Sequence, residues 1–319
     1  MRVLAGDIGG TKTLLQLAEV VGQRCRVYHE QRFVSNDWSD LLTMVVAFLQ
    51  SFSQDLLPES ACFGVAGPVQ ENQVTVTNLS WPSLVAGELA QSLKIKRVAF
   101  INDFQAVGYG LAALVPEDVA ILQVGQERPG QPRALLGAGT GLGQGILVWR
   151  EQEGYYPLAT EGGHVDFAPV DGEQQALLTF LQARYSHVSY ERILSGPGLV
   201  ALYQFIASQH GQWIGDKDPA TITTAALTGT DPWALAALAL FVRIYGQQAG
   251  NLALTCLAQG GVYLAGGIAP RILPVLRDGS FMRAFLAKGR FAPLLATVPV
   301  RVVLNSRVGL LGAALVAAQ

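Results

Sequence analysis

Short apolar runs that stop abruptly at glycine or polar residues recur along the chain. The clearest is residues 98–101, four apolar positions followed at once by Asn102 and Asp103. Such a run is typical of a strand buried on both faces of a parallel sheet. Ligands of open α/β sheets bind at the carboxyl ends of these strands, so Asn102 and Asp103 are candidate functional residues. The alternative is that Asp103 only caps the helix predicted to follow it.

A glycine-rich turn joins the first two predicted strands, residues 3–5 and 14–18. It reads Gly6-Asp7-Ile8-Gly9-Gly10-Thr11-Lys12-Thr13, and the pattern predicts a β-hairpin. Glycine lets backbone N–H groups approach an anion closely, Asp7 could hold a hydrated Mg²⁺, and Thr11 offers a hydroxyl to phosphate. The alternative is an ordinary hairpin whose glycines supply positive φ. The turn is not a P-loop, because it lacks the GxxxxGK[ST] pattern.

The same pattern returns in the second third of the chain. Residues 133–136 form a predicted strand, residues 137–145 a glycine-rich turn containing Thr140, and residues 146–149 another strand. Two hairpins of one type, each opening an α/β segment, indicate an internal duplication. A dinucleotide fingerprint requires a helix after the glycines, so the strand at 146–149 argues against Rossmann-type binding.

Segments with helical periodicity alternate with further apolar or alternating runs, which predicts an α/β protein with mixed strand directions. The further predicted strands are residues 25–34, 61–66, 74–78, 119–122, 261–265 and 300–304. The predicted helices are residues 37–54, 83–93, 172–185, 199–208, 221–227, 232–258, 272–287 and 309–318. The helix at 232–258 is apolar nearly all round and is therefore expected to be buried at a centre.

Composition narrows the class of protein. A length of 319 residues favours two domains, and half of the residues are hydrophobic, so a large core is expected. The net charge of -2 and pI of about 6.1 argue against nucleic-acid binding. Cys25, Cys62 and Cys256 form no CxxC pair, which predicts thiols in the core of a protein from a reducing compartment. The chain starts without a signal-peptide pattern, and its longest apolar run, 234–242, is too short for a bilayer, so we expect a cytoplasmic protein without a membrane partner.

Two further polar groups lie in glycine-rich surroundings. Glu161 and His164 flank two glycines, and Glu191 precedes a turn of serine, glycine and proline. A carboxylate and an imidazole at this spacing could both point into one cavity. The alternatives are that His164 is a satisfied structural histidine and that Glu191 is a solvated partner of Arg192.

Six of these segments occur in the order found in one known family. They are Gly6-Asp7-Ile8-Gly9-Gly10-Thr11-Lys12, Ile101-Asn102-Asp103-Phe104, Gly139-Thr140-Gly141-Leu142-Gly143, Glu161-Gly162-Gly163-His164, Glu191-Arg192-Ile193-Leu194-Ser195-Gly196 and Leu264-Ala265-Gly266-Gly267-Ile268. From Leu4 nearly to the C-terminus the chain resembles the bacterial glucokinase family, in the hexokinase/actin-like ATPase fold group. It lacks the zinc-binding cysteines of the related repressor/open-reading-frame/kinase proteins. Gln144-Gly145 departs from the small or apolar residues common in relatives.

The resemblance implies a two-lobed actin-like ATPase (ribonuclease H-like) fold, with a mixed sheet in each lobe and a cleft between the lobes. Residues 1–105 plus 306–319 would form the small lobe and residues 106–305 the large lobe. The implied activity is transfer of the γ-phosphoryl group of Mg-ATP to O6 of glucose, with Asp103 as the general base. A homodimer formed through the large lobe is also implied.

The resemblance also assigns the remaining site residues. The implied sugar ligands are Asn78, Asn102, Asp103, Glu161, His164 and Glu191. The implied nucleotide-binding residues are Gly6, Asp7, Ile8, Gly9, Gly10, Thr11, Lys12, Gly139, Thr140, Gly141, Gly266 and Gly267, and Asp7 would hold Mg²⁺ through water. Three alternatives stay open: a kinase for another hexose, a non-catalytic sugar-sensing regulator, and ADP or polyphosphate as the donor.

Overall fold

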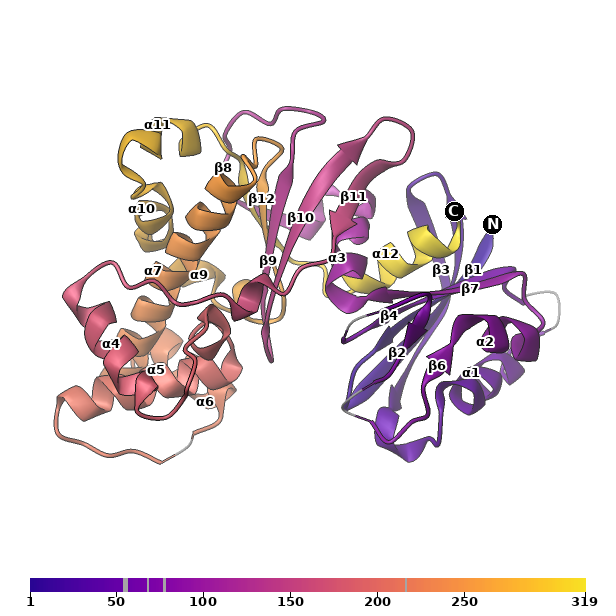
Figure 1. The fold of residues 1–319 in the computed structure, drawn as a ribbon, viewed down its shortest axis with the longest axis horizontal. Coiled ribbons are helices and arrows are strands. Elements are labelled where there is room, and N and C mark those ends of the chain that lie inside the picture. The colour runs from indigo at the N-terminus through magenta and orange to yellow at the C-terminus, as the bar shows by residue number, and fades with distance from the viewer. Residues whose placement is uncertain (54–56, 68, 77–78, 216) are drawn as a thin grey trace. The chain divides into compact units, whose positions relative to one another are not determined.

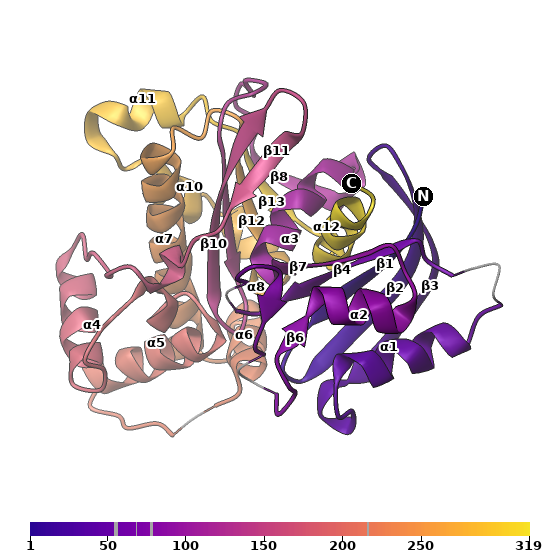
Figure 2. The same cartoon turned by 45° about the vertical axis from the view of Figure 1, so that its right-hand side comes forward.

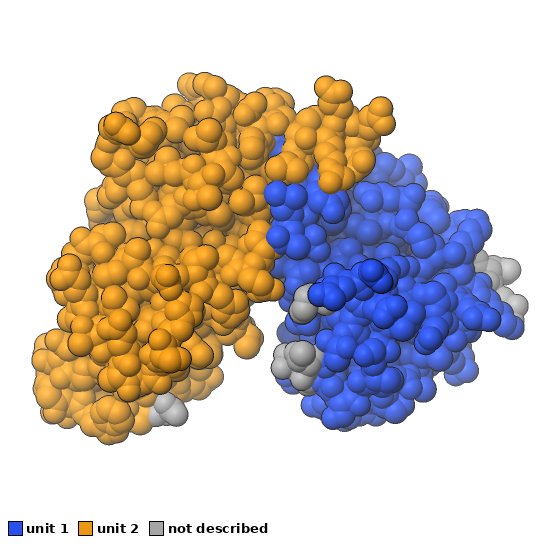
Figure 3. Space-filling model, in the orientation of Figure 1, with its two compact units in different colours: residues 1–117, 155–159, 305–319 blue, residues 118–154, 160–304 orange. Residues whose placement is uncertain are grey.

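The computed structural model describes residues 1–53, 57–67, 69–76, 79–215 and 217–319. These residues form two compact units (Figure 3): unit 1 comprises 1–117, 155–159 and 305–319, and unit 2 comprises 118–154 and 160–304. Residues 106–117 and 155–159 thus fall in unit 1, whereas the sequence placed them in the large lobe. Tyr109 packs edge-to-face on Tyr156 at 6.1 Å, and Gln105 Nε2 donates to the Pro157 carbonyl, which ties these segments to unit 1.

Unit 1 contains one five-stranded sheet in the order β3-β2-β1-β4-β7. Its strands are β1 (Arg2–Ile8), β2 (Lys12–Val21), β3 (Arg24–Val34), β4 (Ser60–Val65) and β7 (Arg97–Asn102). The predicted hairpin is confirmed, because β1 pairs antiparallel with β2 around the glycine turn. β1 also pairs parallel with β4, and β4 with β7, so the carboxyl ends of these three strands lie at one edge.

Helices cover both faces of this sheet (Figures 1 and 2). α1 (Leu41–Gln50) and α2 (Ala86–Leu93) pack on the face that carries Leu4 and Ile8 of β1. α12 (Val308–Ala317) packs on the face that carries Val3 and Ala5, together with Tyr109 of α3 (Asp103–Gly110). Successive residues of a strand point to opposite faces, so a strand covered on both sides must be apolar throughout.

Two predicted elements of unit 1 have different bounds. The helix predicted at 37–54 begins at Leu41, because the Asp40 carboxylate accepts from the Thr43 N–H and so caps the helix there. Residues 35–37 form the 3-10 turn η1 (Ser35–Asp37) instead. The strand predicted at 74–78 is shorter, since β5 (Gln73–Val74) forms a two-residue ladder with β6 (Leu84–Val85). Residues 77–78 lie outside the described residues.

The sheet of unit 2 contains strands in the order β10-β9-β12-β13-β8. They are β8 (Val119–Gln123), β9 (Arg133–Ala138), β10 (Leu142–Arg150), β12 (Val262–Ala265) and β13 (Val300–Val303). Strand β11 (Gly154–Leu158) belongs to unit 1 except for Gly154. As in unit 1, a glycine-turn hairpin, β9-β10, is followed by two strands parallel to its first member. This repeated strand order agrees with the internal duplication predicted from the two hairpins.

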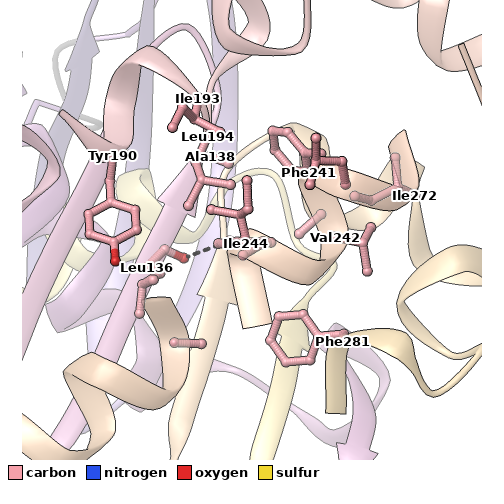
Figure 4. Packing of buried hydrophobic residues seen from close by; sticks show 14 of the residues in the cluster. Leu136, Ala138, Tyr190, Ile193, Leu194, Phe241, Val242, Ile244, Ile272 and Phe281 are labelled. Carbon is pink, nitrogen blue, oxygen red and sulfur yellow. Dashed lines mark hydrogen bonds between the residues drawn. The ribbon is translucent and has the colours of Figure 1, made fainter. Parts of the chain in front are cut away.

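The core of unit 2 surrounds α7 (Pro232–Thr255), which is buried along much of its length as predicted. Figure 4 shows Phe241 and Ile244 of α7 among side chains from β9 and α10, such as Leu136 and Phe281. The Tyr245 hydroxyl donates to the Leu136 carbonyl at 3.4 Å. The other helices are α4 (Gly172–Gln182), α5 (Gly196–Gln209), α6 (Pro219–Thr228), α8 (Ile268–Arg271), α9 (Leu273–Leu276), α10 (Ser280–Leu286) and α11 (Ala292–Leu295).

The single helix predicted at 272–287 is wrong, because that segment contains α9, a break and α10. Pro274 stands in the first turn of α9, and Gly279 has a φ of 91°, which a continuous right-handed helix does not allow. Cys25, Cys62 and Cys256 are free thiols. Within the described ranges no single helix is long and apolar enough to cross a membrane. Helices α6 and α7 together are long and apolar enough, but they are bent by 101° relative to each other.

Candidate active site

Strand β7 ends at Asn102, and α3 starts at the next residue. Asn102 Oδ1 accepts from the N–H groups of Phe104 at 2.9 Å and Gln105 at 3.2 Å, and Gln105 Oε1 accepts from the Asn102 N–H. This reciprocal pair is a capping box, so Asn102 and not Asp103 caps the helix. The carboxylate of Asp103 sits in the first turn, where Oδ1 accepts from the Phe104 N–H at 2.8 Å.

Asp7 and Asp103 lie at the same edge of the unit 1 sheet. The register places Asp7 beside Gly64 of β4, and a Cβ atom on Gly64 would lie 3.6 Å from the Asp103 Cα. Burial and the neighbouring Asp103 carboxylate raise the pKa of Asp7 to about 6, while Lys12 and Arg307 oppose this shift. Two close carboxylates at the carboxyl edge of a sheet create an electrostatic demand for a cation or a donor.

Two hydrogen bonds donated by Ser35 hold the first glycine loop in place. This buried serine donates its N–H to the Thr11 carbonyl at 3.1 Å and its hydroxyl to the Gly9 carbonyl at 2.7 Å. Thr11 and Lys12 at the loop tip are exposed, so both can reach a ligand. Gly6 has a packing role instead, because a Cβ atom there would lie 2.4 Å from the Phe63 ring. The loop is thus a rigid backbone with polar groups at its tip.

Backbone hydrogen bonds also hold the second glycine loop, in unit 2, in place. The Gly139 N–H donates to the Gly141 carbonyl, and the Gly196 N–H donates to the Gly139 carbonyl, both at 2.8 Å. A Cβ atom on Gly139 would meet nothing within 4 Å, so this backbone faces open space. Backbone without a side chain in open space suits the close approach of a phosphate.

The Glu191 carboxylate touches this second loop. Its Oε2 accepts from the Leu142 N–H at 2.9 Å and would lie 2.5 Å from a Cβ atom on Gly141. The alternative that Glu191 is only a solvated partner of Arg192 is wrong, because the Arg192 guanidinium lies over the Tyr185 ring at 4.2 Å. Through Oε2, Glu191 therefore contacts the second glycine loop, while its other oxygen, Oε1, lies near different residues.

His164 lies between two carboxylates on the surface of unit 2. Its Nε2 is 3.9 Å from Glu161 Oε2, and its Nδ1 is 3.9 Å from Glu191 Oε1. These separations are too long for direct hydrogen bonds. The His164 side chain is 58% exposed, which argues against a satisfied structural histidine. An imidazole and two carboxylates at this spacing can donate to and accept from the hydroxyls of a small polar ligand.

The loop that carries Glu161 and His164 lies flat against β10. A Cβ atom on Gly163 would be 1.9 Å from the Leu142 carbonyl oxygen, so only glycine allows this approach. The Gly162 N–H donates to Thr160 Oγ1 at 2.9 Å. The two glycines between Glu161 and His164 thus let the chain pack tightly while both polar side chains stay exposed.

Gly266 and Gly267 follow β12 at the same edge of the sheet as the second glycine loop. Gly266 has a φ of 80°, and a Cβ atom there would lie 2.4 Å from the Ala138 carbonyl oxygen. Gly267 meets nothing within 4 Å. Gly266 is therefore required by the fold, and Gly267 leaves backbone open to a ligand.

Most of the predicted residues thus fall into two sets, one in each unit. Unit 1 carries Gly6, Asp7, Ile8, Gly9, Gly10, Thr11, Lys12, Asn102 and Asp103. Unit 2 carries Gly139, Thr140, Gly141, Glu161, His164, Glu191, Gly266 and Gly267. Asn78 lies outside the described residues. In the part of the chain that the structure describes, no group of three or more His, Cys, Asp or Glu residues could hold a metal. The supporting role of Ser35 had no signal in the sequence.

Comparisons with known proteins agree with this arrangement. A family model described as glucokinase matches residues 4–319. A glucokinase from a Nostoc species is 44% identical, and the match covers 99% of this chain and 99% of that one. The crystal structure of a glucokinase from an Antarctic psychrotroph matches with a TM-score of 0.90 at 32% identity, covering 99% of this chain and 98% of that one. These matches confirm the predicted family resemblance.

A more distant structure shows the same fold. It is a Streptomyces griseus glucokinase of the ROK family, in complex with glucose and AMPPNP, with a TM-score of 0.68 at 22% identity and full coverage of both chains. The predicted fold class, an α/β protein with a mixed sheet in each of two parts, is confirmed by these structures and by the two sheets described above.

Proposed function

The chain belongs to the glucokinase family, and on that premise we propose that it transfers the γ-phosphoryl group of ATP to O6 of glucose. In this reaction the sugar O6 forms a bond to the γ-phosphorus and the bond to the β,γ-bridging oxygen breaks. Glucose 6-phosphate and ADP are the products, and the O6 proton passes to a base. The observation that carries the proposal is the placement of Asp103 directly after strand β7, in the first turn of α3, where Asn102 takes the capping role.

Asp103 is the base in this proposal. Its carboxylate is at the carboxyl edge of the sheet, where the strand order directs ligands. Because Asn102 already caps α3, Asp103 is not required to start the helix. General-base help of this kind is worth about 10²–10⁴ in rate, and positioning and electrostatic stabilisation account for the remainder.

Glu161, His164 and Glu191 are the sugar ligands of unit 2. They combine acceptors and donors on an exposed surface, which is the chemistry that neutral hydroxyl groups require. Asn102 adds an amide from unit 1, where its Nδ2 already donates to the Gly67 carbonyl at 3.3 Å and has a second N–H. Asn78 is also assigned to the sugar by the family resemblance. This set favours a hexose over an anionic substrate, since it contains two carboxylates.

The two glycine loops are the phosphate-binding elements, and ATP is the proposed donor. A protein of the same fold binds glucose together with the ATP analogue AMPPNP, which supports this choice. Gly266 and Gly267 would lie beside the adenosine. Asp7 would hold Mg²⁺ through water, as the family resemblance implies. Its carboxylate lies near that of Asp103, and burial and this neighbouring charge raise its pKa to about 6. When bound, Mg²⁺ neutralises the charge of the phosphates.

Glucose-dependent release of ADP tests the proposal directly. Turnover is measured with glucose, mannose, fructose and N-acetylmannosamine, and with ATP, ADP and polyphosphate as donors. We expect the highest kcat/KM with glucose and ATP. A higher value with another hexose would identify a different sugar kinase, and no turnover with any pair would favour a sugar-sensing regulator.

The role of Asp103 is tested by Asp103→Asn, which removes the base and keeps the shape of the side chain. We expect kcat to fall by about 10²–10⁴, with a modest change in glucose affinity. Glu88→Gln is the matched control, because Glu88 is an exposed acid in the first turn of α2 in the same unit. Wild-type kcat in Asp103→Asn would rule out the assignment. A homodimer, implied by the family, is tested separately by light scattering.

A further inference from the structure

Gln144 lies beneath the loop that carries the proposed sugar ligands. It is the third residue of β10 and is 5% exposed. A Cβ atom on Gly162 would be 3.0 Å from Gln144 Oε1 and 3.2 Å from its Cβ, and Thr160 Oγ1 donates to the Gln144 carbonyl at 3.4 Å. Gln144 therefore supports both ends of the segment in which Glu161 is placed.

The Gln144 amide is the last member of a chain of hydrogen bonds that begins at a lysine. Lys288 Nζ donates to Asn251 Oδ1 at 2.6 Å, Asn251 Nδ2 donates to Gln248 Oε1 at 3.2 Å, and Gln248 Nε2 donates to Gln144 Oε1 at 3.3 Å. An ammonium group has three donors and no acceptor. The charged end therefore sets the direction of the whole chain, and each amide must present its oxygen toward the lysine.

This direction leaves the Nε2 group of Gln144 at the end of the chain. Among the residues that the structure describes, this buried nitrogen has no hydrogen-bond partner. A buried unsatisfied donor is costly in a native protein and calls for an explanation. The row of hydrogen-bonded amides cannot satisfy this nitrogen by rotating every amide group by 180°, because Asn251 would then present an N–H group to the Lys288 ammonium.

From these contacts we infer that Gln144 is a positioning residue for the sugar-binding loop. Its free Nε2–H binds a backbone carbonyl of residues 160–162 when that segment settles on the bound sugar. The nitrogen is buried and is not itself a sugar ligand. Thr160 and Glu161 are exposed, so this part of the loop can shift without opening the core. The inference rests on the proposed sugar kinase function and extends it to a buried residue beneath the proposed sugar ligands.

The test is Gln144→Leu in the full-length protein, with glucose binding measured by titration calorimetry and KM values measured for both substrates. Loss of one neutral hydrogen bond formed only in the sugar complex predicts a glucose affinity about fivefold weaker. The KM for ATP should not change, because the hydrogen bond that is lost is made to residues 160–162, which include a proposed sugar ligand and no proposed phosphate ligand. The thermal midpoint of the sugar-free protein should change little, since the substitution removes one unpaired N–H and leaves another, on Gln248.

Gln174→Leu is the matched control. Gln174 is equally buried in unit 2, but both ends of its amide are bonded, to the Val170 N–H and the Asp171 carboxylate. Its replacement should lower the thermal midpoint and leave glucose affinity unchanged.

Three outcomes decide the matter. Wild-type glucose affinity in Gln144→Leu would overturn the inference while leaving the kinase assignment intact. Equal weakening of glucose binding in Gln174→Leu would show that the effect is general destabilisation, and would also overturn it. A wild-type protein that neither binds nor phosphorylates any hexose would instead refute the proposed function.

Discussion

Replacing Asp7 by asparagine should stabilise the sugar-free protein at neutral pH. The pKa of Asp7 is raised from 3.8 to about 6, first by burial and then by the Asp103 carboxylate. Each pKa unit corresponds to about 1.36 kcal/mol, so the ionised carboxylate costs about 2–3 kcal/mol of folding free energy above pH 7. Asparagine has nearly the same shape and carries no charge, so Asp7→Asn should recover most of this energy.

The sign of the pH dependence follows from which state binds the proton. Between about pH 4 and pH 6 the folded protein keeps the Asp7 proton and the unfolded chain has lost it, so wild-type stability falls as pH rises. The difference between Asp7→Asn and wild type should therefore be near zero at about pH 4 and reach its full value above about pH 7. A chain of this length that unfolds cooperatively has an unfolding entropy of about 0.7 kcal/mol/K. Dividing the expected increase in folding stability by this entropy gives a Tm increase of about 4 °C.

The assay is thermal unfolding of both proteins from pH 4 to pH 8, without magnesium or nucleotide. Asp37→Asn is the control, because Asp37 is an exposed carboxylate of the same unit. The same Asp7→Asn protein should have lost kinase activity. A Tm difference that does not vary with pH, or a variant less stable than wild type at neutral pH, would refute the electrostatic argument.

Three further predictions follow from particular contacts. Glu191→Gln should raise the KM for glucose and for ATP by about tenfold or more, because a charge-assisted bond to the second glycine loop is lost. Glu161→Gln should raise only the KM for glucose. Equal KM values for ATP in the two variants would contradict a connection between Glu191 and the second glycine loop. Gly139→Ala should leave the Tm unchanged and raise the KM for ATP, whereas Gly266→Ala should lower the Tm, since only the latter has positive φ and a clashing neighbour. Gly312→Ala should lower the Tm, because a Cβ atom at residue 312 of α12 would lie 1.8 Å from a carbonyl oxygen of α3. Displacing α12 to relieve this clash should cost about 1–3 kcal/mol or more of folding free energy. An unchanged melting curve would show that the two helices are not closely packed.

Much of the fold could be predicted from local patterns. The two glycine hairpins, the strand before Asn102 and the central helix α7 all correspond to short stretches whose periodicity or turn residues specify them. The strand before Asn102 is at the edge of its sheet and only partly buried. The helix predicted at 272–287 failed for a local reason as well, because Pro274 and Gly279 carried the signal for a break and the apolar spacing masked it.

The site was only partly predictable. The sequence placed Asn102 and Asp103 together at a strand end, but either residue type can cap a helix, and the capping box with Gln105 decided between them. The contact between Glu191 and the Leu142 N–H joins residues that are 49 positions apart. No local pattern encodes a pairing of this kind, because it depends on how the intervening strands and turns are packed.

The strand segments, the glycine turns and the family of the six ordered motifs could all be recognised before any coordinates existed. These properties depend on neighbouring residues, through side-chain alternation and backbone conformational preference. Three-dimensional packing was needed to show that Asp7 and Asp103 share a sheet edge, and that Lys288 directs a row of amides toward Gln144. Hydrogen bonds and charge interactions of this kind act over distances in space, and residues far apart in the chain meet only when the sheet and α7 have packed.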